Sequence, residues 1–208
     1  MGVVTLLRTA ERIIHTAVQL FNEHGTGKVS TNHIASTAQM SPGNLYYHFK
    51  NKEEIIRAIL VQMYAKWNFV WFLPNESKVT REDLRNRLIM NFEILWEFRF
   101  FYREAIALFQ ADEQLKQKHI QMIDSRMAEQ ETFVQRFIEA GVLTIHPDKD
   151  NLRQLLTACW IVANNWLAFL EMNGSVITAE HFQEGVELIW SILTPYLAIK
   201  PAEEESSW

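Results

Sequence analysis

The sequence predicts an all-α protein with about nine helices, and three observations support this fold class. The 208 residues include only seven glycines and five prolines, so few positions interrupt a helix. Apolar residues recur three and four positions apart over most of the chain, which is the spacing of the buried face of an amphipathic helix. Hydroxyl and amide residues that favour helix N-caps precede several of these stretches.

The first predicted helix spans residues 5–24. Its apolar residues follow the spacing i, i+3, i+4, i+7, i+8 and i+11, and Gly25 stands where helices commonly end. The residues on this face are Ala10, Ile13, Ile14, Ala17, Val18 and Phe21. We expect this helix to cover two shorter helices and to complete a three-helix head.

Two short helices joined by a tight turn are predicted in the stretch STNHIASTAQMSPGNLYYHFKNK, residues 30–52. Thr31 and Asn32 can cap the first helix. Ser41 and Pro42 suit the N-cap and the first position of the second. The apolar anchors of that second helix are Leu45 and Phe49. This arrangement is a helix-turn-helix, whose second helix enters the major groove of DNA.

These residues closely resemble the TetR family of bacterial transcriptional regulators over about the first quarter of the chain. The matching positions are Ile34, Ala35, Ala38, Ser41, Gly43, Leu45, Tyr46, His48, Phe49, Lys52, Glu53 and Glu54. Gln39 stands in the turn where this family usually has glycine, a backbone position that other residues occupy at modest cost. The resemblance implies a homodimer that pairs the last two helices of each chain in a four-helix bundle. It also implies a small effector bound in the body, which shifts the spacing of the two heads.

The chemistry of the head suggests which residues contact DNA. A helix N-terminus favours phosphate, and nearby hydroxyl and ring donors can position the head on the backbone. The candidates for this role are Thr31, Ser41, Tyr46, Tyr47 and His48, with the charge of Lys52 added and Asn32 as a further candidate contact. Base reading is expected from Pro42, Gly43 and Asn44. Proline can touch a thymine methyl, glycine lets the protein backbone come close to the bases, and asparagine can pair with adenine.

These head residues also have plain structural interpretations. Pro42 can act only as a helix starter, one of Tyr46 and Tyr47 can be partly buried, and an isolated His48 would more often be a surface histidine.

The body is predicted to begin with a helix from Asn51 to about Phe72, with Asn51 as cap and Glu54 at the third position. Thr80 caps the next helix. Residues 97–104 are dense in aromatic and charged groups and suggest a packed corner, followed by a short helix at 105–110.

A long helix from about 112 to 140 follows and ends at Gly141. The last two helices are expected at about 149–172 and 178–198. Each is apolar over more than one stripe, which favours packing against both its own domain and a second chain.

Aromatic residues concentrate in the body, where all seven tryptophans lie beyond residue 66. The candidate effector-binding residues are Trp67, Trp71, Phe101, Phe109, Trp160, Asn164, Trp166 and Glu171. Aromatic residues at helical spacing are more often core than ligand-binding. The mixture of aromatic and acidic groups leaves a lipophilic and a cationic effector both open.

Charge is distributed unevenly along the chain. The net charge is −5, but residues 1–52 carry five lysines and arginines against two acids, and the remainder carries fifteen against twenty-three. A basic head on an acidic body suits DNA binding, because attraction to phosphate is screened within about 10 Å.

The composition also predicts where the protein resides. The single Cys159 excludes an internal disulfide and fits a reducing cytoplasm. No signal peptide appears, and no apolar run reaches the roughly 18 residues of a membrane helix. We therefore expect a soluble, cytoplasmic protein.

Together these features predict a sequence-specific DNA-binding repressor that acts as a homodimer on a palindromic operator and is released by a small lipophilic effector. The expected domains are the DNA-binding head at 1–52, the effector-binding and dimerisation domain at 53–200 and a flexible acidic tail at 201–208.

Two alternatives are a helical scaffold that binds only protein and a cofactor-free helical enzyme. The scaffold would not need Ser41 to Asn44 beside Tyr46 to His48. For the enzyme, the sequence holds no HExxH, Gly-x-Ser-x-Gly or CxxC motif, and its histidines are too scattered for a metal site. We expect no metal and no cofactor.

Overall fold

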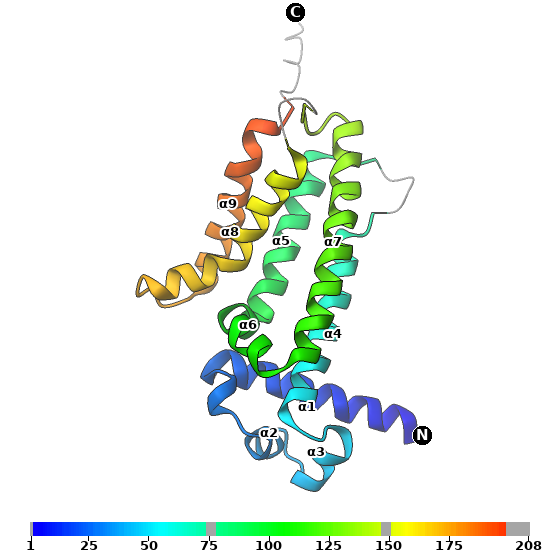
Figure 1. The fold of residues 1–208 in the computed structure, drawn as a ribbon, viewed down its shortest axis with the longest axis vertical. Coiled ribbons are helices and arrows are strands. Elements are labelled where there is room, and N and C mark those ends of the chain that lie inside the picture. The colour runs from blue at the N-terminus through cyan, green and yellow to red at the C-terminus, as the bar shows by residue number, and fades with distance from the viewer. Residues whose placement is uncertain (1, 74–77, 147–150, 199–208) are drawn as a thin grey trace, which may run out of the picture.

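The computed structural model describes residues 2–73, 78–146 and 151–198, and this part of the chain is helical throughout (Figure 1). The predicted all-α fold class is therefore confirmed. The expected acidic tail at 201–208 lies outside the described residues.

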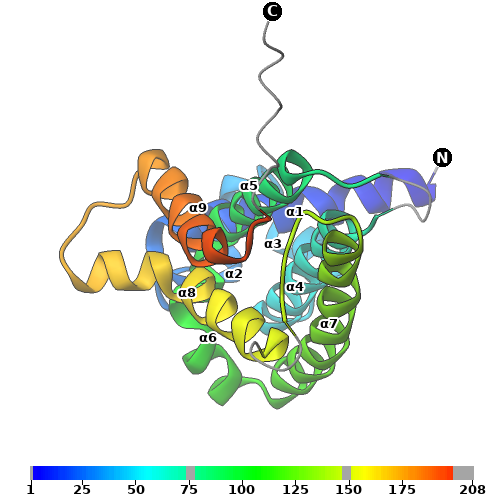
Figure 2. The same cartoon turned by 90° about the horizontal axis from the view of Figure 1, so that it is seen from above.

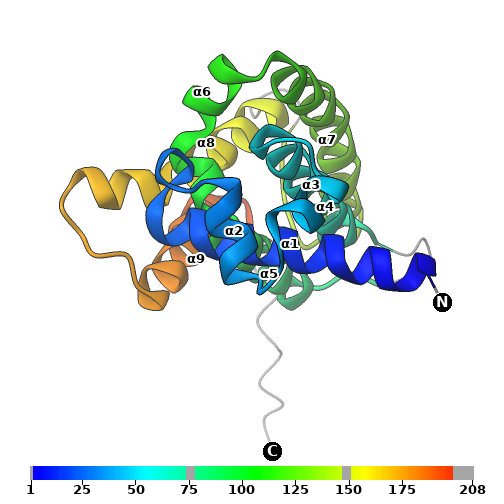
Figure 3. The same cartoon turned by 90° about the horizontal axis from the view of Figure 1, so that it is seen from below.

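The head consists of three helices at one end of the molecule (Figures 1 and 3). Their bounds are Gly2–His24 for α1, Thr31–Thr37 for α2 and Pro42–His48 for α3. Helix α1 ends as predicted at Gly25, whose φ of 79° is the left-handed conformation that glycine adopts without strain. Ile13, Ala17 and Phe21 of the predicted apolar face are fully buried.

The body contains six α-helices within the described residues. Their bounds are Lys52–Trp71 (α4), Arg81–Glu97 (α5), Arg99–Ala111 (α6), Glu113–Glu139 (α7), Leu152–Met172 (α8) and Ala179–Leu193 (α9). Side chains of Asn51, Thr80, Asp112 and Asn151 each accept a hydrogen bond from the backbone N–H of the third helical residue. These caps satisfy N–H groups that a helix start otherwise leaves unpaired.

Two predicted helix boundaries in the body were wrong. The expected corner at residues 97–104 is mostly helical, because α6 starts at Arg99 and only Phe98 interrupts the path from α5. Phe98, Phe100 and Phe101 are buried there, so the aromatic density belongs to the core. The last α-helix ends at Leu193, since Pro195 lies in a 3₁₀ turn, Thr194–Tyr196.

The core is continuous between head and body. Helix α4 packs against α1 in the head and against α5 and α7 in the body. The ring of Phe21 lies 5.2 Å from the ring of Phe100 in α6, centroid to centroid. Viewed from the end opposite the head, α4, α5, α7, α8 and α9 surround the long axis of the body (Figure 2). A short antiparallel bridge between Leu143 and Leu197 ties the segments that follow α7 and α9.

Helix α8 corrects one expectation about hydropathy. Its 21 residues are long and apolar enough to span a membrane by length and composition, with a mean hydropathy of 1.3, although uninterrupted apolar runs are short. Polar residues such as Asn164 and Asn165 interrupt the run without lowering the average below that of a candidate span. Only 17% of this window is buried within the chain, and the apolar side chains of Ile161 and Phe169 are among those exposed.

Candidate nucleic-acid interface and effector cavity

Helices α2 and α3 are each started by a serine. The hydroxyl of Ser30 accepts from the N–H of His33, 3.1 Å away, and that of Ser41 accepts from the N–H of Asn44, 3.2 Å away. Pro42 occupies the first turn of α3, as predicted. The prediction that Thr31 and Asn32 cap α2 was wrong by one residue, because Ser30 has the extended backbone of an N-cap and Thr31 is already helical.

The turn between α2 and α3 accommodates Gln39 with φ of 53°, the only positive φ outside glycine among the described residues. The left-handed conformation is uncommon for a residue with a Cβ and costs roughly 1 kcal/mol. The turn is nevertheless closed by two backbone hydrogen bonds, from Gln39 to Ser36 and from Met40 to Ala35, both of 3.0 Å. The helix-turn-helix therefore forms without glycine at this position.

The outer face of α3 is exposed and polar. Tyr47 is 73% exposed and Tyr46 is 47% exposed, although tyrosine is usually more buried than this. The hydroxyl of Tyr46 lies within hydrogen-bond distance, 2.9 Å, of the hydroxyl of Thr31, and this contact links α3 to α2 at the surface. Pro42, Gly43 and Asn44 are exposed beside them, while Leu45 is fully buried and holds α3 to the core.

Of the remaining predicted DNA contacts, Asn32 is exposed and His48 is half-buried. The ring of His48 lies edge-on to that of Tyr47, with centroids 5.3 Å apart. Lys52 is tied to the head, because its ammonium donates to the carbonyls of Thr26 at 2.7 Å and Val29 at 3.2 Å. Nine of the ten candidates lie on α2, on α3 or at the N-cap of α3, and Lys52 is the first residue of α4.

The joint between head and body is a hydrogen-bonded network around Asn22, which is 8% exposed. Its amide donates to the carbonyl of Glu97 at 2.8 Å and accepts from the N–H of Phe100 at 3.0 Å. The guanidinium of Arg103 donates to the carbonyl of Asn22 at 2.9 Å and forms an ion pair with Glu171 of α8 at 2.8 Å. Helix α6 thus connects the end of α1 with the far end of α8.

A second contact of the joint involves Glu104. Its carboxylate accepts from the N–H and the hydroxyl of Thr26, in the loop that follows α1. Neither Asn22 nor Glu104 stood out in the sequence, because their partners lie more than 70 residues away. Only the fold brings them together.

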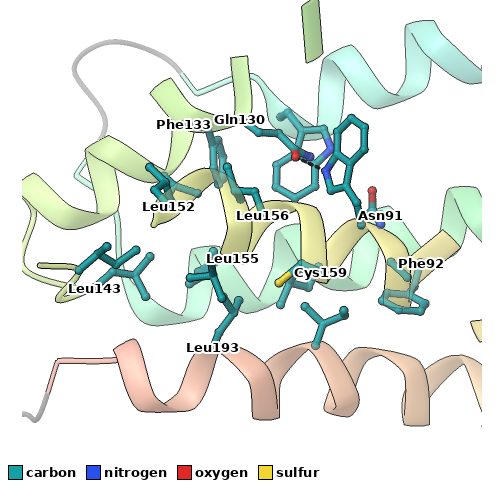
Figure 4. A pocket seen from close by; sticks show the side chains of 18 residues that line it. Asn91, Phe92, Gln130, Phe133, Leu143, Leu152, Leu155, Leu156, Cys159 and Leu193 are labelled. Carbon is teal, nitrogen blue, oxygen red and sulfur yellow. Dashed lines mark hydrogen bonds between the residues drawn. The ribbon is translucent and has the colours of Figure 1, made fainter. Parts of the chain in front are cut away.

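The body contains a cavity of about 70 Å³ lined by side chains of α5, α7, α8 and α9 (Figure 4), and Trp71 of α4 also lines it. Most of its wall is leucine, phenylalanine and other apolar side chains. Asn91 and Gln130 are the amides that line it, and none of the lining residues is Asp, Glu, Lys, Arg or His. Gln130 accepts a hydrogen bond from the indole N–H of Trp160. Burial raises the pKa of the Cys159 thiol to about 11, so that group is also uncharged at neutral pH.

The structure brings two of the eight candidate effector residues to this cavity, Trp71 and Trp160. The other six do not line it: they are Trp67, Phe101, Phe109, Asn164, Trp166 and Glu171. Glu171 pairs with Arg103 at the joint, and the indole of Trp166 donates to the carbonyl of His181 at 2.7 Å. Seven of the sixteen cavity residues that the sequence did not indicate are leucines, which resemble any core position.

A compact group of polar and aromatic side chains lies between α4, α6 and α7. The Tyr64 hydroxyl is 2.7 Å from Nδ1 of His119, whose ring lies 4.8 Å from that of Phe109 and 5.6 Å from that of Phe101. Burial lowers the pKa of His119 to about 4, so the imidazole is neutral. Burial also raises the pKa of Tyr64 and of Tyr102 above the usual tyrosine value. Three residues of this group were not among the sequence candidates, namely Tyr64, Tyr102 and His119.

Arg126 of α7 belongs to the same group and is only 2% exposed. Its guanidinium lies 5.1 Å from the ring of Trp67 and donates to Oδ1 of Asn68 at 2.6 Å. Burial lowers the pKa of Arg126, and Glu129, Tyr102 and Tyr64 act in the opposite direction. A buried arginine carries no local sequence signal, because arginine is normally found at the surface.

Comparison with known proteins shows which family has this helical architecture. Residues 70–204 match the TetR family described as bacterial transcriptional repressors, and residues 13–59 match its N-terminal domain, described as bacterial regulatory proteins of the tetR family. The chain belongs to the TetR family. The resemblance noted in the helix-turn-helix is therefore confirmed and extends over most of the chain. This is a family of transcriptional regulators, not of enzymes.

Solved structures of this TetR-family fold include near neighbours. A TetR-family transcriptional regulator from Marinobacter aquaeolei VT8 has a TM-score of 0.82 at 30% identity, and the match covers 94% of each chain. A complex of SmeT with triclosan has a TM-score of 0.64 at 18% identity over 93% of each chain, which shows a shared fold alone.

Curated relatives are similar to part of this chain. QacR of Staphylococcus aureus is 32% identical over 96 residues, which is 38% of this chain and 51% of QacR. The probable acrEF/envCD operon repressor of Escherichia coli K12 is 36% identical over 56 residues, 27% of this chain and 26% of that protein. The chain thus spans about half or less of the length of these relatives.

Proposed function

We propose that the protein is a sequence-specific DNA-binding repressor of the cytoplasm, acting as a homodimer on a palindromic operator. The observation that supports this most directly is the exposed face of α3. Two exposed tyrosines stand beside Pro42, Gly43 and Asn44, and Ser41 fixes the start of the helix. Such a surface of donors around a helix N-terminus suits phosphate contact, with short residues free to approach base edges.

Dimerisation through α8 and α9 would explain the apolar side chains left exposed on these helices. Ile161 is 59% exposed, and Phe169 and Leu188 are also exposed. Large apolar side chains exposed on two helices that pack together suit an interface between copies of the chain. A twofold dimer would place two heads about one turn of DNA apart, which is why we propose a palindromic operator.

The effector would be a small lipophilic molecule that enters the cavity of the body. Small-molecule sites usually measure about 300–1,000 Å³, so a cavity of about 70 Å³ would have to widen on binding. Movement of α8 would reach the head through Glu171, Arg103 and Asn22. A ligand that favours the widened form would thereby shift the spacing of the two heads and release the operator.

Three measurements test the proposal. Sedimentation should give a dimer, and a salt titration against random duplex DNA should show affinity that falls steeply with salt. Genomic fragments selected by the protein should then contain an inverted repeat. A monomer without affinity for duplex DNA in dilute buffer would refute the proposal.

A matched pair of variants tests the dimer. Ile161→Glu places a charge on the exposed face of α8 and should produce a monomer that has lost most of its operator affinity. Ile106→Glu changes an isoleucine of α6 that is 76% exposed and should leave both properties intact. If Ile161→Glu stays a dimer, the interface lies elsewhere.

A further inference from the structure

The buried side-chain nitrogen and oxygen atoms without a hydrogen-bond partner all lie in one place within the described residues. They are Nε and Nη1 of Arg126 and Nε1 of Trp67. All three are N–H donors, and the two side chains are in contact, with the guanidinium carbon 5.1 Å from the indole ring. Three buried N–H donors therefore lie on two side chains in contact, without a hydrogen-bond acceptor from the described part of the chain.

The guanidinium has few compensating contacts. Nη2 donates to Oδ1 of Asn68 at 2.6 Å and contacts the sulfur of Met122 at 3.8 Å. Arg126 forms no ion pair with a carboxylate in the described part of the chain, and Glu129, one turn away on α7, accepts from Ser125 instead. A buried cation with unpaired N–H groups is costly, and Arg carries its charge at any physiological pH. The group that would best satisfy these donors is an anion with two oxygens, such as a carboxylate.

This donor group lies next to the effector cavity. Trp67 precedes Trp71 by four residues on α4, and Arg126 precedes Gln130 by four residues on α7. Trp71 and Gln130 both line the cavity. Residues four apart are neighbours on one face of a helix, so the donors lie one helical turn from the cavity wall along the seam of α4 and α7.

We propose that the effector is an amphipathic acid, whose apolar part enters the cavity and whose carboxylate or similar anionic group is held by Arg126 and Trp67. This deepens the proposed effector function and rests on it. The cavity supplies apolar contact without any charged side chain, and the adjacent arginine supplies a buried positive charge that selects the head group. A cationic effector is disfavoured, because no acid lines the cavity and the nearest buried charge is positive.

Four probes with matched chemistry test this selection by isothermal titration calorimetry. Decanoate, decanol and decyltrimethylammonium share a ten-carbon tail and differ in the charge of the head group, and acetate has the anion without the tail. We expect decanoate to bind at least about tenfold more tightly than decanol, since hydrogen bonds to charged groups contribute more than a tenfold change. The cation and acetate should bind most weakly. Three results would overturn the proposal: equal affinity for decanoate and decanol, binding of acetate as tight as that of decanoate, or binding of no probe. The N–H groups of Arg126 and Trp67 would then be satisfied by water or by a free ion.

Variants of Arg126 then test whether this residue causes the preference for decanoate over decanol. Arg126→Met removes the charge at similar volume and should bind decanoate no better than decanol, while Arg126→Lys should retain part of the preference because it keeps the charge without the planar fork. Arg153→Met, which removes an exposed arginine of α8, is the control and should behave as the wild type. Arg126→Met should also melt at the same or a higher temperature without ligand, since apolar replacement of a poorly paired buried ion is often neutral or stabilising. If Arg126→Met folds and still prefers decanoate over decanol as strongly as the wild type does, the proposal is overturned. If Arg126→Met does not fold, Arg126→Lys decides: a preference as large as that of the wild type would assign Arg126 a structural role and overturn the proposal.

Operator affinity of the unliganded protein is measured in parallel. If the protein binds an operator but does not distinguish the head groups, this inference fails alone. If it distinguishes the head groups but binds no DNA, the proposed repressor function fails and the acid-binding site remains.

Discussion

In the head, the side chains proposed to meet DNA are exposed and polar, whereas in the body the groups proposed to meet an effector are buried and almost entirely apolar. Tyr47 is 73% exposed, and Arg126 is 2% exposed. The difference has an energetic consequence. Exposed side chains contribute little to folding, so substitutions on the head should change binding without changing stability. Buried side chains of the body take part in both, so the two effects must be measured separately there.

Two glycines test this contrast most strongly. A Cβ on Gly185 of α9 would meet the ring of Phe92 and come within 2.7 Å of Cδ1 of Trp166, while a Cβ on Gly43 of α3 would meet nothing within 4 Å. Gly185→Ala should lower the free energy of unfolding by about 1–3 kcal/mol through overpacking, despite the higher helix propensity of alanine. Gly43→Ala should leave it unchanged or raise it by up to about 1 kcal/mol.

Urea unfolding and operator binding of both variants separate the two regions. Gly43→Ala should bind the operator more weakly, because the added methyl lies where the backbone is proposed to approach the bases. Equal stability of the two variants would mean that α9 can shift away from α5 at little cost, and the contrast between a rigid body and a tolerant head would be lost.

Asn44 tests whether the head reads sequence. Its backbone N–H is held by Ser41, so removing its side chain leaves the cap of α3 intact. Asn44→Ala should lose discrimination at one base pair, worth about 1–3 kcal/mol, without changing the melting temperature. Binding to operators with single base-pair changes measures this, with Gln135→Ala of α7 as an exposed amide control. An unchanged binding profile would remove Asn44 from base reading.

Local features of the chain could be predicted from sequence more fully than sites assembled by packing. Ser41 and Pro42 were correctly assigned to the start of α3, because a cap depends on its nearest neighbours in the chain. Trp67 and Trp71 shared the same prediction, yet only Trp71 lines the cavity. The two residues share one face of α4, so what separates them is where along the helix the cavity begins. That position depends on how several helices pack together, and no residue pattern within one helix specifies it.

His119 gives the body a pH response. Burial lowers its pKa to about 4 in the folded state, against about 6.5 in an unfolded chain. The folded protein thus binds fewer protons, and stability should fall by about 1–2 kcal/mol as the pH decreases from about 6.5 towards 4. His119→Gln should flatten this part of the stability profile in urea unfolding, and His15→Gln, at an exposed position of α1, should not. Identical profiles for the wild type and His119→Gln would show that another group governs the acid response.

Lys52 lies where the contrast between the regions is weakest, because it is a head residue that also supports the fold. Its ammonium donates to the carbonyls of Thr26 and Val29, which leaves one N–H for a phosphate. Lys52→Met keeps most of the stem and should weaken binding to all DNA sequences alike, reducing the slope of log affinity against log salt by about 1. Lys28→Met, in the loop that Lys52 holds, controls for nearby charge that is not assigned to phosphate. If the slope is unchanged while the protein is destabilised, Lys52 serves only to fix the loop before α2, and α3 with its flanks must supply the phosphate contacts.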